Sequence, residues 1–247
     1  MNETIDRIMS HRSIRKFTEQ PVSQEQLETI IAAAQMASTS SNVQAYSVIR
    51  IVDQQKRKAI AGLAGNQKYV EECSEFLVWC ADLHRLREAY ALHADPEEAY
   101  ISTMENLIVA TVDTALAAQN AAIAAESLGL GIVYIGALRN NIAEIGELLE
   151  LPKLVYPIFG MCIGYPEQET LVRPRLPMEA ILHEDKYSDE NYSAAMADYD
   201  ARTQAYMASR SSSKVSATWT EGVYTKLVKP TRMHMKDYLD SQGFNQV

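Results

Sequence analysis

Apolar residues recur along the chain with a period near 3.6 in some segments and near two in others, so the sequence predicts both helices and strands. The predicted helices cover about 5–9, 24–37, 53–63, 97–128, 142 onward, 190–208 and 219–241. Short runs rich in β-branched or apolar residues predict strands at 46–52, 76–81, 131–135 and 156–163. The order of these elements indicates a mixed α and β protein without internal repeats.

Several predicted helices begin at residues whose side chains cap helices. Ser23 stands three residues before Gln26, which is the spacing of a capping box. Asp53 precedes the next helix. Asn141, with Glu144 three residues on, is expected to cap the helix after the 131–135 strand.

The longest helical pattern, 97–128, ends at Gly129 and is apolar nearly all round. Between Asn106 and Ala125, Asp113 is the single charged residue. Uncharged polar residues interrupt the segment, so a membrane span is not expected. The pattern fits either a central core helix or a helix in a dimer interface.

Composition adds limits to this picture. The chain has 247 residues, of which 47% are hydrophobic and 22% charged, which suits one large domain or one domain with appendages. Its formal net charge of −9 opposes a general role in binding nucleic acid or an anionic membrane. Residues 201–247 carry seven basic and three acidic side chains, a net of +4, which leaves −13 for the first 200 residues.

The cysteines and the N-terminus indicate the compartment. Cys73, Cys80 and Cys162 are odd in number and lack C-x-x-C spacing, so buried thiols are expected rather than disulfides or a zinc site. Glu3 and Asp6 stand where a signal peptide carries basic residues, and no uninterrupted apolar run follows them. We therefore expect a cytoplasmic protein.

Standard catalytic and nucleotide-binding motifs are missing from the sequence. It has no P-loop and no G-x-S-x-G elbow, and the glycines after the long helix do not fit a dinucleotide fingerprint. The five histidines are dispersed, so no metal site is expected.

Two basic clusters, 11–16 and 173–175, stand out in the acidic chain. Guanidinium groups grip phosphate oxygens through two parallel hydrogen bonds, so the clusters favour a phosphate site, while solvated surface arginines remain the alternative. The hydroxyl-rich run 38–41 offers further donors, although such runs are usually plain loops.

Six ordered motifs carry a family resemblance: HRSIRKFT, ASTSSNVQAYS, GNQKYV, AAESLGLGIVYIGALRNN, FGMCIGYP and RPRLP. Together they resemble the oxygen-insensitive NADPH nitroreductase and flavin reductase branch of the FMN-dependent nitroreductase family, over nearly the whole chain. The resemblance implies an α+β fold with a central, mostly antiparallel sheet flanked by helices. It also implies an intertwined homodimer with the long helix at its interface. Residues 1–188 would form the FMN-binding core, and 189–247 a helical extension with an NADPH-binding loop.

The resemblance also implies roles for individual residues. FMN would be held by His11, Arg12, Ser13, Arg15, Thr39, Ser41, Gln67, Lys68, Tyr69, Tyr134, Ile135, Gly136, Ala137, Arg173 and Arg175. NADPH would be held by Arg210 and Lys214, and the acceptor by Ser41, Asn42, Lys229 and Arg232. Arg15 would stabilise the negative charge of reduced flavin. The family often has lysine at position 173 and a second glycine at position 137.

The implied activity is a ping-pong, two-electron reduction of nitroaromatics, quinones or free flavin by NADPH. Neither a side-chain nucleophile nor a metal is required. A flavin-binding sensor or carrier without efficient turnover is the alternative. The motifs do not select among nitro compound, quinone, free flavin and chromate as acceptor.

Overall fold

The computed structural model describes residues 2–209 and 218–244, and the chain forms two compact units. The first comprises the residues up to Thr170 together with those from Arg232 onward. The second is Leu171–Thr231. Each unit has its own internal packing.

The first unit is built on an antiparallel sheet. Its strands are β1 (Tyr46–Arg50), β2 (Glu75–Asp82), β3 (Gly131–Ile135) and β4 (Val155–Gly164), in the spatial order β1-β2-β4-β3. Each adjacent pair is antiparallel. All four predicted strands are present, and the α+β class with an antiparallel sheet is confirmed.

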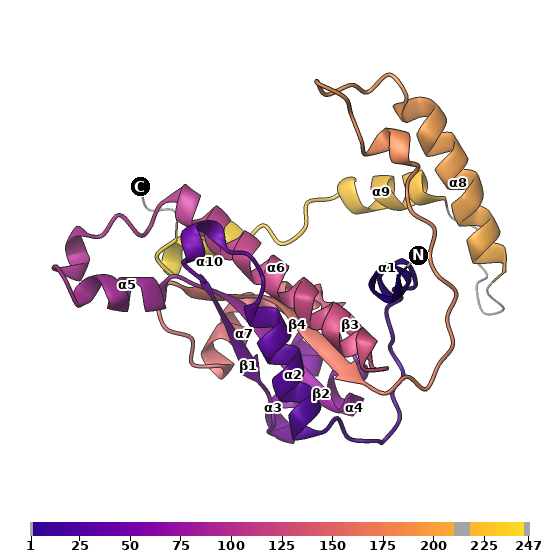
Figure 1. Cartoon of the computed structure of the whole chain (residues 1–247). Helices are drawn as coiled ribbons and strands as arrows, with labels where there is room; N and C mark the ends of the chain where they lie inside the picture. The colour runs from indigo at the N-terminus through magenta and orange to yellow at the C-terminus, as the bar shows by residue number, and fades with distance from the viewer. Residues whose placement is uncertain (1, 210–217, 245–247) are drawn as a thin grey trace. The chain divides into compact units, whose positions relative to one another are not determined.

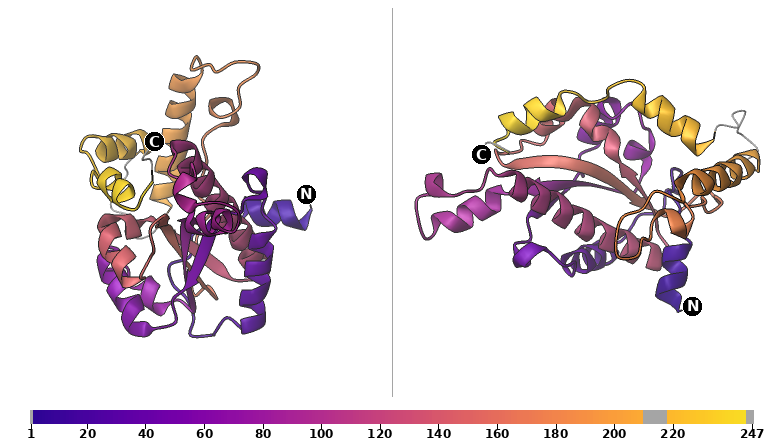
Figure 2. Two further views of the ribbon diagram at one scale, coloured as in Figure 1. Left: turned by 90° about the vertical axis from the view of Figure 1, so that its left-hand side faces the viewer. Right: turned by 90° about the horizontal axis from the view of Figure 1, so that it is seen from above.

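Helices cover both faces of this sheet (Figures 1 and 2). The described helices of the first unit are α1 (Glu3–Met9), α2 (Gln24–Gln35), α3 (Gln54–Leu63), α4 (Tyr69–Glu72), α5 (His84–Ala91), α6 (Met104–Ser127), α7 (Ile142–Leu148) and α10 (Met235–Ser241). Short 3-10 turns lie at η1 (Ser40–Asn42), η2 (Pro96–Glu98) and η3 (Gly136–Asn141).

The two faces of the sheet explain why β2 is buried along its whole length. Phe76 and Val78 pack in one apolar cluster with residues of α3, α4 and α7. Leu77 and Trp79 pack in a second cluster with residues of α2 and α6. Successive side chains of a strand point to opposite faces, so a strand between two helical layers must be apolar throughout. The three cysteines are buried free thiols, as expected.

Helix α6 begins later than the sequence pattern predicted. Thr103 caps it by accepting a hydrogen bond from the Asn106 N–H at 3.1 Å, and the segment from 97 belongs to η2 and a connecting loop. The prediction of a helix from 97 was therefore wrong, because Thr103 is the better N-cap. Among the described residues, α6 is apolar and long enough to cross a membrane, but its buried alanines pack against the sheet as those of a core helix do.

Two of the three predicted caps are confirmed. Ser23 and Gln26 form the reciprocal capping box of α2. Asp53 accepts hydrogen bonds from the second and third N–H groups of α3. Asn141 does not cap α7, because its Nδ2 donates instead to the Leu63 carbonyl at 2.6 Å.

The second unit contains the turn η4 (Met178–Ala180) and the helices α8 (Tyr192–Ala208) and α9 (Trp219–Leu227). Asp200 of α8 joins the two helices by accepting a hydrogen bond from the Thr220 N–H at 3.0 Å. The predicted single helix over 219–241 is wrong. Pro230 disfavours helical geometry in the residue before it, and α10 is a separate helix of the first unit.

Candidate functional site

The basic loop at residues 11–16 is attached to the edge strand β3. The Ile14 N–H donates to the Ile132 carbonyl at 2.9 Å, and the Ile14 side chain is buried. Gly131 permits this close approach, since a Cβ at that position would lie 2.5 Å from Ile14 Cγ1. With Ile14 buried, Arg12 and Arg15 remain exposed on the loop.

Arg15 brings the basic loop to the GNQKYV motif. Its guanidinium group lies near the Tyr69 hydroxyl. Burial raises the pKa of Tyr69, and the positive charge of Arg15 partly offsets that rise. The backbone N–H of Arg15 donates to Gln168 Oε1 at 3.2 Å. Two motifs separated by about fifty residues therefore meet at one guanidinium group.

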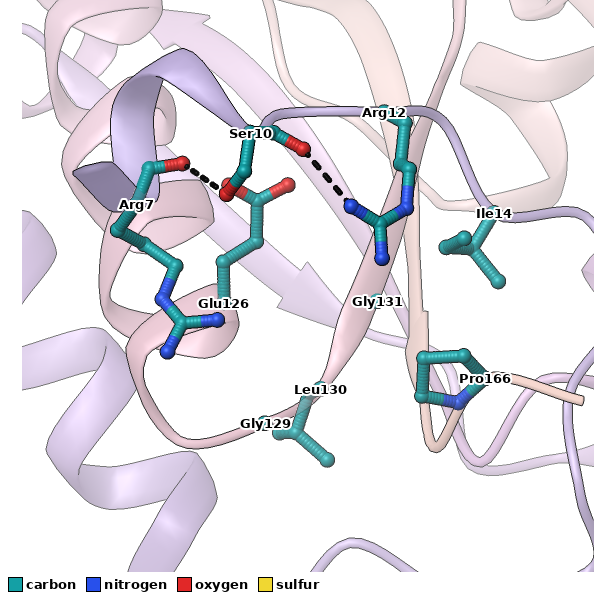
Figure 3. Close-up of a pocket in the computed structure, with 9 residues that line it drawn as sticks. All are labelled: Arg7, Ser10, Arg12, Ile14, Glu126, Gly129, Leu130, Gly131 and Pro166. Atoms are coloured by element: carbon teal, nitrogen blue, oxygen red, sulfur yellow. Dashed lines mark hydrogen bonds between the residues drawn. The ribbon is translucent and has the colours of Figure 1, made fainter. Parts of the chain in front are cut away.

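The first residue of the loop is bonded to α6. His11 Nδ1 lies 2.6 Å from Oε1 of Glu126, in the last turn of that helix. A small cavity of about 100 Å³ beside this pair is lined by Arg7, Arg12 and Glu126, among others (Figure 3). Sequence reasoning did not single out Glu126, although it lies in the AAESLGLG motif.

The hydroxyl-rich loop after α2 is held by Asp113 of α6. This carboxylate, 1% exposed, accepts hydrogen bonds from the Ser40 N–H at 3.0 Å and the Ala45 N–H at 3.1 Å. Ser41 and Asn42, between these anchors, have positive φ angles of 47° and 58°. A left-handed conformation at consecutive non-glycine residues is costly and needs such anchoring. The sequence signal for this role was the single charge in the 106–125 segment.

The end of β3 carries the third group of predicted residues. Tyr134 is half-buried, and its ring packs edge-on against Phe159 at 5.0 Å between centroids. Burial raises the pKa of Tyr134, and the nearby Glu126 carboxylate raises it further. Gly136 opens the turn η3, in which Ala137 is also half-buried.

Arg232 lies beside η3 in the first unit. Its Nε donates to Asn140 Oδ1 at 3.0 Å. Burial lowers the pKa of Arg139, and the positive charge of Arg232 lowers it further. Lys229, another predicted acceptor residue, belongs to the second unit and is exposed.

The second unit contains the RPRLP cluster. Arg173 and Arg175 are both exposed, and Arg175 Nη1 donates to the Arg173 carbonyl at 2.7 Å. The predicted NADPH residues, Arg210 and Lys214, lie outside the described residues.

The candidate arginines lack carboxylate partners in the described part of the chain. Arg12, Arg15, Arg173 and Arg175 form none of the ion pairs found there. Arg50, by contrast, donates two hydrogen bonds of 2.7 Å to Glu75. Guanidinium groups without such partners in the described structure are suited to binding an anionic group.

Fold and site together define an α+β protein with basic, hydroxyl-bearing loops suited to an anionic cofactor. A family model described as the nitroreductase family matches residues 8–165, and one described as the C-terminal domain of that family matches 173–247. The chain belongs to the nitroreductase family. The resemblance carried by the sequence motifs is confirmed.

Individual relatives are similar over almost their whole length. The NADPH-flavin oxidoreductase of Vibrio harveyi is 44% identical over 243 residues, covering 98% of both chains. The oxygen-insensitive NADPH nitroreductase of Salmonella typhimurium is 44% identical over 246 residues, covering 99% of both. The solved structure of the NADPH:FMN oxidoreductase from Vibrio harveyi complexed with NAD+ superposes with a TM-score of 0.90, at 41% identity and full coverage of both chains.

Proposed function

We propose that this chain is an NADPH-dependent flavin oxidoreductase that binds FMN with its basic loop, the loop after α2 and the end of β3. The reaction class and the two cofactors, FMN and NADPH, agree with the names of two relatives and one solved structure that are 41–44% identical over nearly the full length. FMN, when bound, supplies the redox chemistry by taking a hydride from NADPH and passing two electrons to an acceptor.

The arginines would provide charge at both ends of the cofactor. Arg12, Arg173 and Arg175 are assigned to the phosphate, where guanidinium groups form charge-assisted hydrogen bonds. Arg15 is assigned to the flavin ring, where a fixed positive charge stabilises the reduced, anionic form. The guanidinium group lies near Tyr69, which is also assigned to the cofactor.

The two other segments would supply hydrogen bonds and shape. Thr39 and Ser41 offer hydroxyl groups from the loop that Asp113 anchors. The backbone from Ile135 to Ala137 turns into η3 and offers amide groups. Further cofactor contacts are assigned to the side chains of His11, Ser13, Gln67, Lys68, Tyr69 and Tyr134.

A homodimer is part of this proposal. Helix α6 exposes an apolar stripe at four-residue spacing, formed by Met104, Ile108, Val112 and Leu116, which are 45–51% exposed. Side chains four apart lie on one helix face, and an exposed apolar face of this kind is typical of an interface. A second copy of the chain would cover the stripe.

We also propose a cytoplasmic location, as for an enzyme that draws on the cellular NADPH pool.

The remaining assignments concern NADPH and the acceptor. Arg210 and Lys214 are assigned to the 2′-phosphate of NADPH because they lie in the basic tail of an acidic chain. Ser41, Asn42, Lys229 and Arg232 are assigned to the acceptor, whose class is a small molecule with anionic or nitro oxygens.

The observation that carries the proposal is the set of arginines that form no ion pair within residues 2–209 and 218–244 of a nitroreductase-family chain. Anaerobic mixing of the purified protein with NADPH tests it. We expect a yellow protein whose visible flavin absorbance is lost on reduction and restored by nitroaromatic, quinone or free flavin. A flavoprotein that NADPH leaves oxidised would instead support the sensor or carrier alternative.

The phosphate assignment gives a first prediction. Arg173→Ala and Arg175→Ala should each weaken FMN binding by up to about 1.5–3 kcal/mol, the contribution of a hydrogen bond to a charged group. Equilibrium dialysis of the apoprotein against FMN measures this. Arg202→Ala is the matched control, since Arg202 pairs with Asp198 on the surface of α8 at 2.7 Å. If Arg173→Ala and Arg175→Ala bind FMN as tightly as the wild type and Arg202→Ala do, the phosphate assignment is contradicted.

A further inference from the structure

The His11 imidazole has one nitrogen bonded and one nitrogen free. Nδ1 lies 2.6 Å from Glu126 Oε1, and Nε2 has no hydrogen-bond partner among the described residues. A carboxylate only accepts hydrogen bonds, so Nδ1 must carry the hydrogen. The ring is 30% exposed, which leaves Nε2 as the nitrogen available to a ligand.

Glu126 occupies a position that does not favour a carboxylate by itself. It lies in the last turn of α6, where the free carbonyl groups give the helix end a negative potential. Its side chain is only 11% exposed, so water provides little compensation. A hydrogen bond from His11 offsets both effects, and the short distance shows that the two groups are in direct contact.

Other groups around Glu126 come from three different segments. Arg7 of α1 and Arg12 of the basic loop line the cavity beside it (Figure 3). Tyr134 of β3 lies close enough for the Glu126 charge to raise its pKa. Glu126 therefore lies among residues of two segments that are assigned to FMN, although no motif assigns it a contact with the cofactor.

We propose that Glu126 is a positioning residue for the cofactor: it accepts the Nδ1 hydrogen of His11 and holds the ring so that Nε2 faces bound FMN. The inference rests on the proposed function, which places His11 against FMN. Carboxylates that orient metal-bound histidines act in the same way, by fixing the tautomer and the ring orientation. Without Glu126, the ring can rotate and exchange its tautomers.

FMN titration of the apoprotein tests this proposal with Glu126→Ala, Glu126→Gln, His11→Ala and the double variant His11→Ala/Glu126→Ala. We expect Glu126→Ala to raise the Kd for FMN about tenfold, the lower end of the range for partners that orient ligand histidines. Glu126→Gln should recover most of the affinity, since its amide oxygen can accept the Nδ1 hydrogen. The double variant should bind no more weakly than His11→Ala, because Glu126 acts through His11.

The nitrogen-15 spectrum of the imidazole gives a readout that a stabilising role in the fold would not change. The His11 signal, identified by its loss in His11→Ala, should show a protonated Nδ1 in the wild type and mixed tautomers in Glu126→Ala. Glu88→Ala is the control, because His84 Nε2 and Glu88 Oε1 lie 4.0 Å apart at an exposed site. It should change neither FMN affinity nor the His11 signal.

The outcomes separate the two proposals. Wild-type affinity in a folded Glu126→Ala protein overturns the positioning role, as does a loss of affinity that adds fully to that of His11→Ala. A wild-type apoprotein that takes up no FMN overturns the proposed function itself. A His11→Ala variant that binds FMN as tightly as the wild type also overturns the positioning role, because His11 then makes no contact with the cofactor. That result leaves the proposed flavin reaction unaffected.

Discussion

Two aspartates make the same number of backbone hydrogen bonds in very different surroundings. Asp113 is 1% exposed and accepts from the N–H groups of Ser40 and Ala45. Asp53 is exposed and accepts from two N–H groups at the start of α3. Water can replace the exposed Asp53 carboxylate, but it has little access to the buried Asp113 site.

These surroundings predict unequal losses of stability. Asp113→Ala should lower the free energy of unfolding by about 2–4 kcal/mol, since a buried N–H is left without an acceptor. Asp53→Ala should lower it by about 1 kcal/mol, the usual effect of losing an N-cap. Urea unfolding of both variants measures the difference. Similar losses would mean that water reaches the Asp113 site.

Tyr238 of α10 has a buried hydroxyl group without a hydrogen-bond partner in the described structure. Burial raises the pKa of Tyr238 to about 12, from an ordinary value of about 10. The unfolded chain therefore loses this proton at lower pH than the native protein does. The titration of Tyr238 therefore leaves the free energy of unfolding unchanged below pH 10 and lowers it as the pH rises toward 12.

Tyr238→Phe should remove this pH dependence. At pH 7 we expect the free energy of unfolding to rise by about 1 kcal/mol, because a buried hydroxyl without a partner is destabilising. The advantage over wild type should grow above pH 10, where only the wild type loses stability through this group. Urea unfolding between pH 7 and pH 11 measures both effects. Tyr224→Phe, at an exposed position, serves as the control and should follow the wild type.

Helix boundaries could be predicted from sequence where a local signal settles them. Ser23 and Asp53 cap their helices because nearby N–H groups suffice as partners. Asn141 has the same local signal but bonds to Leu63, which is distant in sequence. The start of α6 was placed too early because the helical pattern extends back to residue 97, and the capping by Thr103 marks the true boundary.

The apolar stripe of α6 predicts which substitutions would dissociate the proposed dimer. Ile108→Arg or Val112→Arg places a charge in the proposed interface, where desolvation without a partner is costly. Each variant should dissociate to monomers at micromolar concentration and lose FMN. Analytical ultracentrifugation together with flavin absorbance checks this.

An exposed leucine of the first unit provides the control for the stripe. Leu92, 81% exposed, follows α5, and Leu92→Arg should leave both the dimer and the flavin unchanged. A flavin-bound monomer of Ile108→Arg would show that the stripe is not the interface.

At the scale of the whole molecule, the candidate site depends on contacts that no local pattern shows. The motifs identified Arg15 and Tyr69 separately, and the fold brings their side chains together. Glu126 and Asp113 act on loops more than sixty residues away, so only the packing of α6 against the sheet reveals them. The sequence therefore proposes members of the site, whereas the residues that hold their loops are seen only in the fold.

The uneven charge of the chain leads to a prediction about the nucleotide. Residues 201–247 carry +4 and the rest −13, which suits capture of the extra phosphate of NADPH by Arg210 and Lys214. Arg210→Ala should raise the KM for NADPH with little change in kcat, because the contact is remote from the transferred hydride. The reaction with NADH should be nearly unaffected.

Steady-state kinetics with both nucleotides, at low and high salt, check this prediction. The NADPH preference of the wild type should weaken with added salt, since an exposed ion pair is screened over about 8–10 Å at physiological ionic strength. An equal loss for NADH and NADPH in Arg210→Ala would show that this residue serves the fold or the flavin instead.

The attachment of the basic loop to β3 has a consequence for solubility. β3 is an edge strand, and an edge with free backbone groups can pair with a strand of another molecule. The bond from Ile14 to Ile132 places the chain's own segment against that edge, and Gly131 leaves room for it. A side chain at position 131 would displace this segment, so such variants should aggregate during expression before any defect in turnover becomes measurable.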